Sequence, residues 1–232
     1  MQSDSLAPTV DDSLRLRARQ ARAEIEAGGL RGAALLELLR GIPVLERDAW
    51  VDELLGIEAP PPDMPDLPRG AVPYLPSGVE EIVAIVLEAP IHPDDELVDL
   101  GSGLGRVVLL AHLLSGARAR GVEIQAHLVA SARARCAAIG VTGVSFVHAN
   151  AADLALEGSI FFLYAPFNGQ LLARVLGRLE EVARRRPIVV CAVDVEPDVP
   201  WLLRRKTSAG SLTLYDSCVP GVPARSPSAP SR

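Results

Sequence analysis

The second half of the chain alternates short, almost wholly apolar runs with longer amphipathic ones. Short apolar runs predict buried strands, whereas apolar positions that recur with helical spacing predict helices. The strand-like runs are ELVDLG (96–101), ARGVEI (119–124), VSFVHA (144–149), SIFFLY (159–164) and PIVVCAV (187–193). Helix-like segments lie between them at 106–116, 125–140 and 168–185. This alternation indicates an α/β fold whose mostly parallel sheet carries helices on both faces.

The pattern changes near the end of the chain. The strand-like runs WLLRRKTS (201–208) and SLTLYDS (211–217) are separated only by Ala209 and Gly210, a spacing that favours a hairpin. This hairpin would add an antiparallel C-terminal strand to the parallel sheet. Residues 219–232 are rich in Pro and Ser and predict a disordered tail.

Residues 1–58 predict a separate N-terminal helical module. Leu14, Ala18, Ala21 and Ile25 fall on one helical face, and two further helices fit LRGAALLELLRG (30–41) and ERDAWVDELLG (46–56). We expect Trp50 to anchor the core of this module. From their position, the helices are expected to cover a pocket or shape an acceptor site, although they would equally serve dimerisation or stability.

A proline-rich linker, residues 59–73, separates this module from a second domain at 74–218. The stretch 59–76 holds seven prolines and predicts an extended, semi-rigid segment. Ser77 and Glu80 follow with the spacing of a capping box, in which both side chains satisfy free amides at a helix start. The helix that they begin is expected to run to about Ala89.

Composition narrows the classes of partner. The chain has 232 residues, 49% of them hydrophobic, and a net charge of -6, so a nucleic-acid partner is not expected. Arg184, Arg185 and Arg186 are interpreted as a solvated helix end. The three cysteines form no C-x-x-C pair, and the four histidines show no ligand spacing, which predicts no disulfide framework and no metal site. With no signal core and no membrane-length apolar run, a cytoplasmic protein without a membrane partner is expected.

The stretch DLGSGLGR, residues 99–106, carries the first candidate chemistry. Gly101, Gly103 and Gly105 follow a predicted strand at the carboxyl edge of the sheet, where ligands bind. Such glycines allow close approach of a ligand, or else they only pack a strand against a helix. The dinucleotide pattern requires a glycine where this chain has Arg106, and Asp99 would repel a pyrophosphate. A ligand with a cationic amine, such as S-adenosylmethionine (SAM), suits the charge of Asp99.

Two further positions suit an adenosine ligand. Glu123 ends the second strand, where a carboxylate can accept hydrogen bonds from both ribose hydroxyls; alternatively, it is a solvated acid. Asn150 follows the third strand and can donate to and accept from an adenine edge, with Asp153 as a second candidate. Either residue could instead cap the next helix.

The order of these motifs resembles the class I SAM-dependent methyltransferases over residues 74 to about 214. VDLGSGLGR is similar to the first motif of that family, GVEI to its acidic second motif and FVHANAADL to its third, where the family often has Asp in place of Asn150. The resemblance implies a Rossmann-like, seven-stranded, mostly parallel sheet with an antiparallel C-terminal strand, and SAM as cofactor, with S-adenosylhomocysteine as product. The cofactor-binding residues would be Asp99, Gly101, Ser102, Gly103, Gly105, Glu123, Asn150 and Ala151.

A narrower resemblance links YLPSGVEEI (74–82) to the non-SET histone-lysine methyltransferases and to small mitochondrial-type protein-lysine methyltransferases. In those families a Y-x-P element helps to close the SAM pocket. The resemblance implies that Tyr74 and Ser77 approach the methionine end of SAM. The alternative for Tyr74 is an aromatic side chain that only packs in the linker.

The acceptor side is predicted at YAPFNG, residues 164–169, with Tyr164, Pro166 and Phe167 as its wall; alternatively, these residues only pack a strand end. Many amino-group methyltransferases carry Asn or Asp before Pro-Pro and an aromatic residue here. That acid or amide is missing, which argues against adenine or glutamine N-methylation. His148 and Tyr164 are candidates, by position, for removing the acceptor proton.

The sequence therefore predicts an enzyme that transfers a methyl group in line to a nucleophilic N or O acceptor, with protein lysine preferred. A small-molecule methyltransferase and a non-catalytic SAM-binding module are the alternatives. A nicotinamide-dependent oxidoreductase is disfavoured by Asp99 and Arg106. The sequence indicates no oligomeric state.

Overall fold

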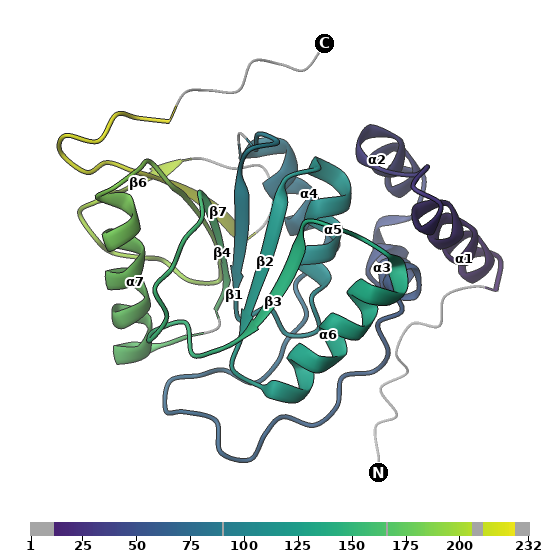
Figure 1. Ribbon diagram of the computed structural model, residues 1–232, viewed down its shortest axis with the longest axis horizontal. Helices are drawn as coiled ribbons and strands as arrows, with labels where there is room; N and C mark the ends of the chain where they lie inside the picture. Colours follow the sequence, from purple (N-terminus) through teal and green to yellow (C-terminus); the bar gives the residue numbers. More distant parts are fainter. Residues whose placement is uncertain (1–11, 90, 166, 206–210, 226–232) are drawn as a thin grey trace.

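A computed structural model describes residues 12–89, 91–165, 167–205 and 211–225. Its centre is one seven-stranded sheet in the order β3-β2-β1-β4-β5-β7-β6 (Figure 1). The strands are β1 (Glu96–Leu100), β2 (Arg118–Glu123), β3 (Val144–His148), β4 (Ile160–Tyr164), β5 (Val189–Val193), β6 (Leu202–Arg205) and β7 (Leu212–Ser217). The five strands from β3 to β5 are parallel, and β7 pairs antiparallel with both β5 and β6. This confirms the predicted sheet, including its antiparallel C-terminal strand.

Helices cover both faces of the sheet, as the strand-helix alternation predicts. The helices α4 (Val79–Glu88), α5 (Arg106–Ser115) and α6 (Ala126–Ile139) pack on one face, and α7 (Gly169–Ala183) packs on the other. Successive strand residues alternate between the two cores: Phe162 belongs to the first and Phe161 to the second. Cys191 is fully buried in the first core, as expected of a small apolar residue in a central strand.

The N-terminal module packs on the same face as α4, α5 and α6. It consists of α1 (Asp12–Glu26), α2 (Gly32–Arg40), a 3-10 turn at Val44–Glu46 and α3 (Arg47–Leu55). The predicted apolar face of α1 is buried, and Trp50 is completely buried. These side chains form one continuous hydrophobic cluster with those of α4 and α5. The described part of the module therefore shares its core with the sheet.

The predicted capping box at the start of α4 is wrong. The N-cap residue is Gly78, and no side chain of this segment caps the helix. Asp48 Oδ1, from α3, accepts the hydrogen bond of the Val79 amide at 2.8 Å. Glu80 instead forms an ion pair with Arg47. A carboxylate from another helix thus takes the place that the sequence assigns to Ser77.

Two predictions near the C-terminus are only partly described. The β6–β7 pairing matches the predicted hairpin, but its turn, with Ala209 and Gly210, lies outside the described residues. Within the predicted tail, residues 219–225 are described, and Arg225 forms an ion pair with the buried Asp95.

Candidate active site

One pocket lies at the carboxyl edge of the parallel strands. Its walls come from the ends of β2, β4 and β5, from the segment after β3 and from the proline-rich residues 59–76, called the strap below. Eight of the predicted site residues line it: Tyr74, Ser77, Gly101, Glu123, Asn150, Ala151, Tyr164 and Phe167. Asp99, Ser102, Gly103 and Gly105 are buried next to it, and Pro166 lies outside the described residues.

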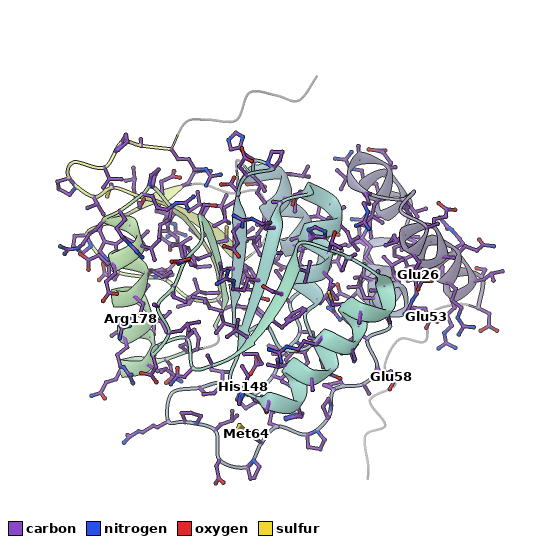
Figure 2. The ribbon with its side chains drawn as sticks, viewed as in Figure 1. Glu26, Glu53, Glu58, Met64, His148 and Arg178 are labelled. Atoms are coloured by element: carbon purple, nitrogen blue, oxygen red, sulfur yellow. The ribbon has the colours of Figure 1, made fainter. Side chains whose placement is uncertain are left out.

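The strap forms the roof of this pocket. At one end, Asp63 Oδ1 accepts hydrogen bonds from Gln125 Nε2 at 2.7 Å and from the Tyr74 amide at 3.0 Å. The Met64 amide donates to Gln125 Oε1 at 2.8 Å, and Figure 2 labels Met64 on the strap at this edge of the sheet. At the other end, the Asn168 amide donates to the Gly70 carbonyl at 2.9 Å. Leu67, Val72 and Leu75 give the roof an apolar lining. Sequence reasoning identified residues 59–73 only as a linker and placed Tyr74, by resemblance, at the pocket.

The glycine loop is closely covered by Tyr74. Gly103 has a φ of 49°, and a Cβ atom there would overlap the Tyr74 ring. Burial is the main reason that the pKa of Tyr74 is raised to about 12, while Arg106 opposes that shift and Asp52 and Asp99 add to it. The phenol of Tyr74 is therefore protonated, and its ring lies against the glycine loop. Tyr74 thus contacts the first motif, and its approach to the methionine end of SAM stays a prediction.

Glu123 is held in a fixed orientation at the end of β2. It is 6% exposed, and its two carboxylate oxygens accept hydrogen bonds from the Gly103 amide at 2.9 Å and from the Gln125 amide at 2.8 Å. Each oxygen keeps a second lone pair for a ligand hydroxyl. Two amides thus aim this carboxylate into the pocket.

Asp99 is 3% exposed and lies below the loop. Burial, together with the nearby charge of Glu123, raises its pKa well above the usual value. Burial disfavours the charged form of this carboxyl group. A cationic ligand group nearby would have the opposite effect and favour its ionisation. The arrangement can therefore recognise positive charge.

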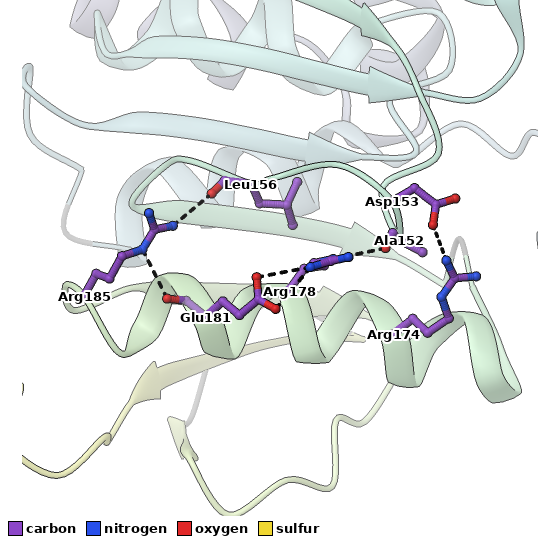
Figure 3. Close-up of polar contacts among 7 residues, drawn as sticks. All are labelled: Ala152, Asp153, Leu156, Arg174, Arg178, Glu181 and Arg185. Atoms are coloured by element: carbon purple, nitrogen blue, oxygen red, sulfur yellow. Dashed lines mark hydrogen bonds and ion pairs between the residues drawn. The ribbon is translucent and has the colours of Figure 1, made fainter.

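The segment after β3 carries Asn150 into the pocket and leaves Asp153 outside it. Asn150 Oδ1 also accepts the hydrogen bond of the Ala152 amide at 3.0 Å. Asp153 forms an ion pair with Arg174 of α7, as Figure 3 shows. Arg178 of the same helix donates to the Ala152 carbonyl at 3.2 Å. The helix α7 thus fixes this segment, which favours Asn150 over Asp153 as the adenine contact.

The wall around Tyr164, where the acceptor side is predicted, carries negative charge. Burial raises the pKa of Tyr164, and the negative charges of Asp194, Glu81 and Asp48 raise it further. Asp194 follows β5, lines the pocket and has a φ of 52°, and Ala165, after β4, has a φ of 36°. Non-glycine residues with positive φ are uncommon and often occur at functional sites. Sequence reasoning missed Asp194, although an acid directly after a buried strand is a signal that could have found it.

His148 lies apart from the pocket. Its ring is exposed, and Nε2 lies 3.0 Å from the Ile124 carbonyl oxygen; Figure 2 shows it at the end of β3. Within the described ranges, no group of three or more His, Cys, Asp or Glu residues could hold a metal ion. In the same residues, no helix is long and apolar enough to cross a membrane.

The sheet has the Rossmann-like topology, with its antiparallel C-terminal strand, that the resemblance to class I SAM-dependent methyltransferases implies, so the predicted fold is confirmed. No family model matches the chain. The chain is similar to a protein-L-isoaspartate O-methyltransferase from Methylorubrum extorquens, with 34% identity over 110 residues, which are 43% of this chain and 42% of the relative. It thus spans about two fifths of the length of that relative.

Two of the solved structures that match the chain are methyltransferases by name. An RNA methyltransferase from Salinibacter ruber in complex with S-adenosyl-L-homocysteine has a TM-score of 0.48 and 25% identity, over 63% of this chain and 95% of that one. A geranyl diphosphate methyltransferase with GPP and sinefungin has a TM-score of 0.40 and 20% identity, over 49% of this chain and 43% of that one. The preference for lysine as the acceptor stays a prediction.

Proposed function

We propose that the protein is a SAM-dependent methyltransferase. The observation that carries the proposal is that one pocket is lined by Glu123, Asn150, Tyr74 and Tyr164 together. Glu123 would accept hydrogen bonds from the ribose hydroxyls, and Asn150 would contact the adenine edge. Asp99 would attract the methionine ammonium from below the glycine loop.

SAM, when bound, supplies a methyl group that is already activated by its positive sulfur. The acceptor lone pair forms a bond to the methyl carbon while the carbon-sulfur bond breaks, leaving S-adenosylhomocysteine. The residues of this chain therefore mainly hold the reactants in line and exclude water, and good alignment supplies about 7–11 kcal/mol of the barrier. The strap roof and Tyr74 suit this task, because they close the pocket above the glycine loop.

The acceptor that we propose is a lysine-like amine. Asp194, Glu81 and Asp48 surround Tyr164 with negative charge, which attracts an ammonium and repels a carboxylate. This charge disfavours an isoaspartyl carboxylate, the acceptor that the name of the Methylorubrum relative indicates. The amine must lose a proton before it attacks. The raised pKa of Tyr164 keeps its phenol protonated, so Asp194 is the better proton acceptor of the two.

Ligand binding tests the first part of the proposal. We expect SAM and S-adenosylhomocysteine to raise the melting temperature, since a ligand that binds only the folded state stabilises it. Glu123→Ala should abolish that shift, whereas the control Asp153→Asn, outside the pocket, should keep it. Stabilisation by a dinucleotide and none by SAM would overturn the proposal.

Methyl transfer from labelled SAM tests the acceptor. Label in a protein pool, recovered as methyl-lysine, is expected, and Asp194→Asn should lower its rate while leaving SAM affinity unchanged. Label confined to a small-molecule extract would reassign the enzyme to the small-molecule alternative. SAM binding without any transfer would leave the non-catalytic module as the function.

A further inference from the structure

One buried guanidinium joins the glycine loop to the N-terminal module. Arg106 is the first residue of α5, directly after the loop, and only 6% of its side chain is exposed. Its Nε and Nη2 donate to the two carboxylate oxygens of Asp52 at 2.9 and 2.5 Å. Its Nη1 donates to the Ser77 carbonyl at 2.8 Å. A single side chain therefore contacts α3 and the segment between the strap and α4.

The same segment is held from a second side. Asp48, one turn before Asp52 on α3, accepts the hydrogen bond of the Val79 amide, and its Oδ2 lies 3.9 Å from Arg106 Nη1. The Ser77 carbonyl and the Val79 amide are thus both fixed by groups of this cluster. Because backbone atoms are held rather than side chains, the path of residues 77–79 is determined by α3 and Arg106 together.

The path of residues 77–79 in turn sets the position of Tyr74. Only two residues separate Tyr74 from Ser77, and the Tyr74 ring lies on Gly103. The Arg106 and Asp52 charges both affect the pKa of the Tyr74 phenol. If the Ser77 carbonyl moved, the ring would leave the glycine loop and the pocket would lose part of its roof.

We propose that Arg106 is a positioning residue for the pocket. Its guanidinium fixes the end of the strap to α3 and so holds Tyr74 over the glycine loop. Arg106 does not line the pocket, so it acts through Ser77 and Tyr74. A lysine would keep the charge but not the planar fork that binds a carboxylate and a carbonyl at once. The inference rests on the proposed function, because it takes SAM as the ligand of the pocket.

The first test compares two arginines with the same pattern of contacts. Arg205 also pairs bidentately with an aspartate, Asp216, and donates to a backbone carbonyl, that of Glu88 at 3.2 Å, but it lies on β6, away from the pocket. We expect Arg106→Lys to weaken SAM binding about tenfold by calorimetry, while Arg205→Lys changes it less than about twofold. Equal SAM affinity in wild type and Arg106→Lys would overturn the inference.

The second test separates positioning from a general loss of stability. In a double-mutant cycle on SAM affinity, Tyr74→Ala combined with Arg106→Lys should bind no more weakly than Tyr74→Ala alone, because both act through the ring. Effects that multiply would show that Arg106 does not act through Tyr74. Asp52→Asn, which keeps the shape of the carboxylate, should reproduce the behaviour of Arg106→Lys.

A third measurement needs no ligand. The Tyr74 and Val79 amides are hydrogen-bonded to Asp63 and Asp48, so their hydrogen exchange reports the position of this segment. We expect exchange at least about tenfold faster in Arg106→Lys and unchanged in Arg205→Lys. Unchanged exchange at both amides would overturn the inference. If wild type binds no SAM, the proposed function fails, and the exchange result still decides the role of Arg106.

Discussion

Two aspartates at β1 have opposite pKa shifts, and the difference separates a structural residue from the one that we propose to attract the ligand. Burial alone would raise the pKa of Asp95, but hydrogen bonds from the His92 amide and the Ser159 hydroxyl and the charge of Arg225 lower it. Burial raises the pKa of Asp99, and the charge of Glu123 adds to that shift. The folded protein therefore stabilises the ionised form of Asp95 and disfavours that of Asp99.

The first prediction concerns stability without ligand. The pKa of Asp99 is higher in the folded state than its usual value of 3.8. Between these two pKa values the folded state keeps a proton that the unfolded state loses, so stability falls as the pH rises. At neutral pH, Asp99→Asn should therefore raise the melting temperature. Asp95→Asn should lower it, because the lowered pKa of Asp95 gives stability that is lost only in acid. A lower melting temperature for Asp99→Asn would contradict this account.

The second prediction concerns the pH dependence of SAM binding. A cationic ligand needs Asp99 ionised, so SAM affinity should rise with pH up to the raised pKa of Asp99, and binding below that pKa should release a proton. Calorimetry in buffers of different ionisation enthalpy measures this release. Asp99→Asn should abolish it and weaken SAM roughly tenfold or more, the loss expected for one hydrogen bond to a charged group. If the Asp99→Asn variant still released a proton on binding SAM, the proton would come from another group.

At this scale the sequence predicts residues that belong to local motifs. Glu123 ends β2 and Asn150 follows β3, and both residues are predicted from these positions and line the pocket. Asp194 has the same kind of position, but no spacing relates it to Tyr164, because β4 and β5 are neighbours only in the folded sheet. The ion pair between Asp52 and Arg106 joins residues 54 positions apart, and no local pattern reveals such a contact.

At the scale of elements, the glycine loop offers a third prediction. Gly103 and Gly140 both have positive φ, of 49° and 69°, but a Cβ would overlap Tyr74 at Gly103 and would meet nothing within 4 Å at Gly140. Gly140→Ala should lower the free energy of unfolding, measured with denaturant, only by the backbone strain of about 1–2 kcal/mol. Gly103→Ala should cost more and should also weaken SAM binding. Equal costs for the two variants would argue against the Tyr74 contact.

The start of α4 gives a fourth prediction. Asp48 caps this helix from α3, so Asp48→Ala should lower the free energy of unfolding by about 1 kcal/mol, as is typical of a lost helix cap. Ser77→Ala should cost clearly less, because the Ser77 side chain makes no cap. If denaturant titrations showed a larger loss of unfolding free energy for Ser77→Ala than for Asp48→Ala, the capping box would be the correct assignment. The sequence misassigned this cap because Asp48 lies 31 residues before Val79.

For the whole molecule, the pattern of apolar positions was sufficient to predict the sheet. Each strand-like run forms a strand, and β4 and β5, inside the sheet, are buried along almost their whole length, as parallel strands covered on both faces should be. The strap was harder to predict. Its prolines indicate an extended segment, but its place over the pocket depends on Asp63 and Gln125, which meet across 62 positions of the chain.

The shared core gives a fifth prediction. Trp50 and Leu54 of the module belong to the same hydrophobic cluster as Ile82 and Val108 of α4 and α5. The described chain should therefore unfold in one cooperative transition, with equal calorimetric and van't Hoff enthalpies. A chain that begins at residue 59 should lose this cooperativity. Two separate transitions in the full chain would instead show that residues 1–58 fold as an independent domain.

The contact between Asp52 and Arg106 also bears on the order in which the protein is made. The ribosome completes the N-terminal helices before it synthesises Arg106, and α4 and β1 lie between the two partners. Until then Asp52 cannot bind the Arg106 guanidinium, and the helices cannot bury their apolar faces against α5. The first helices to be synthesised therefore cannot complete their packing until α5 has been made, and their apolar faces stay exposed until then.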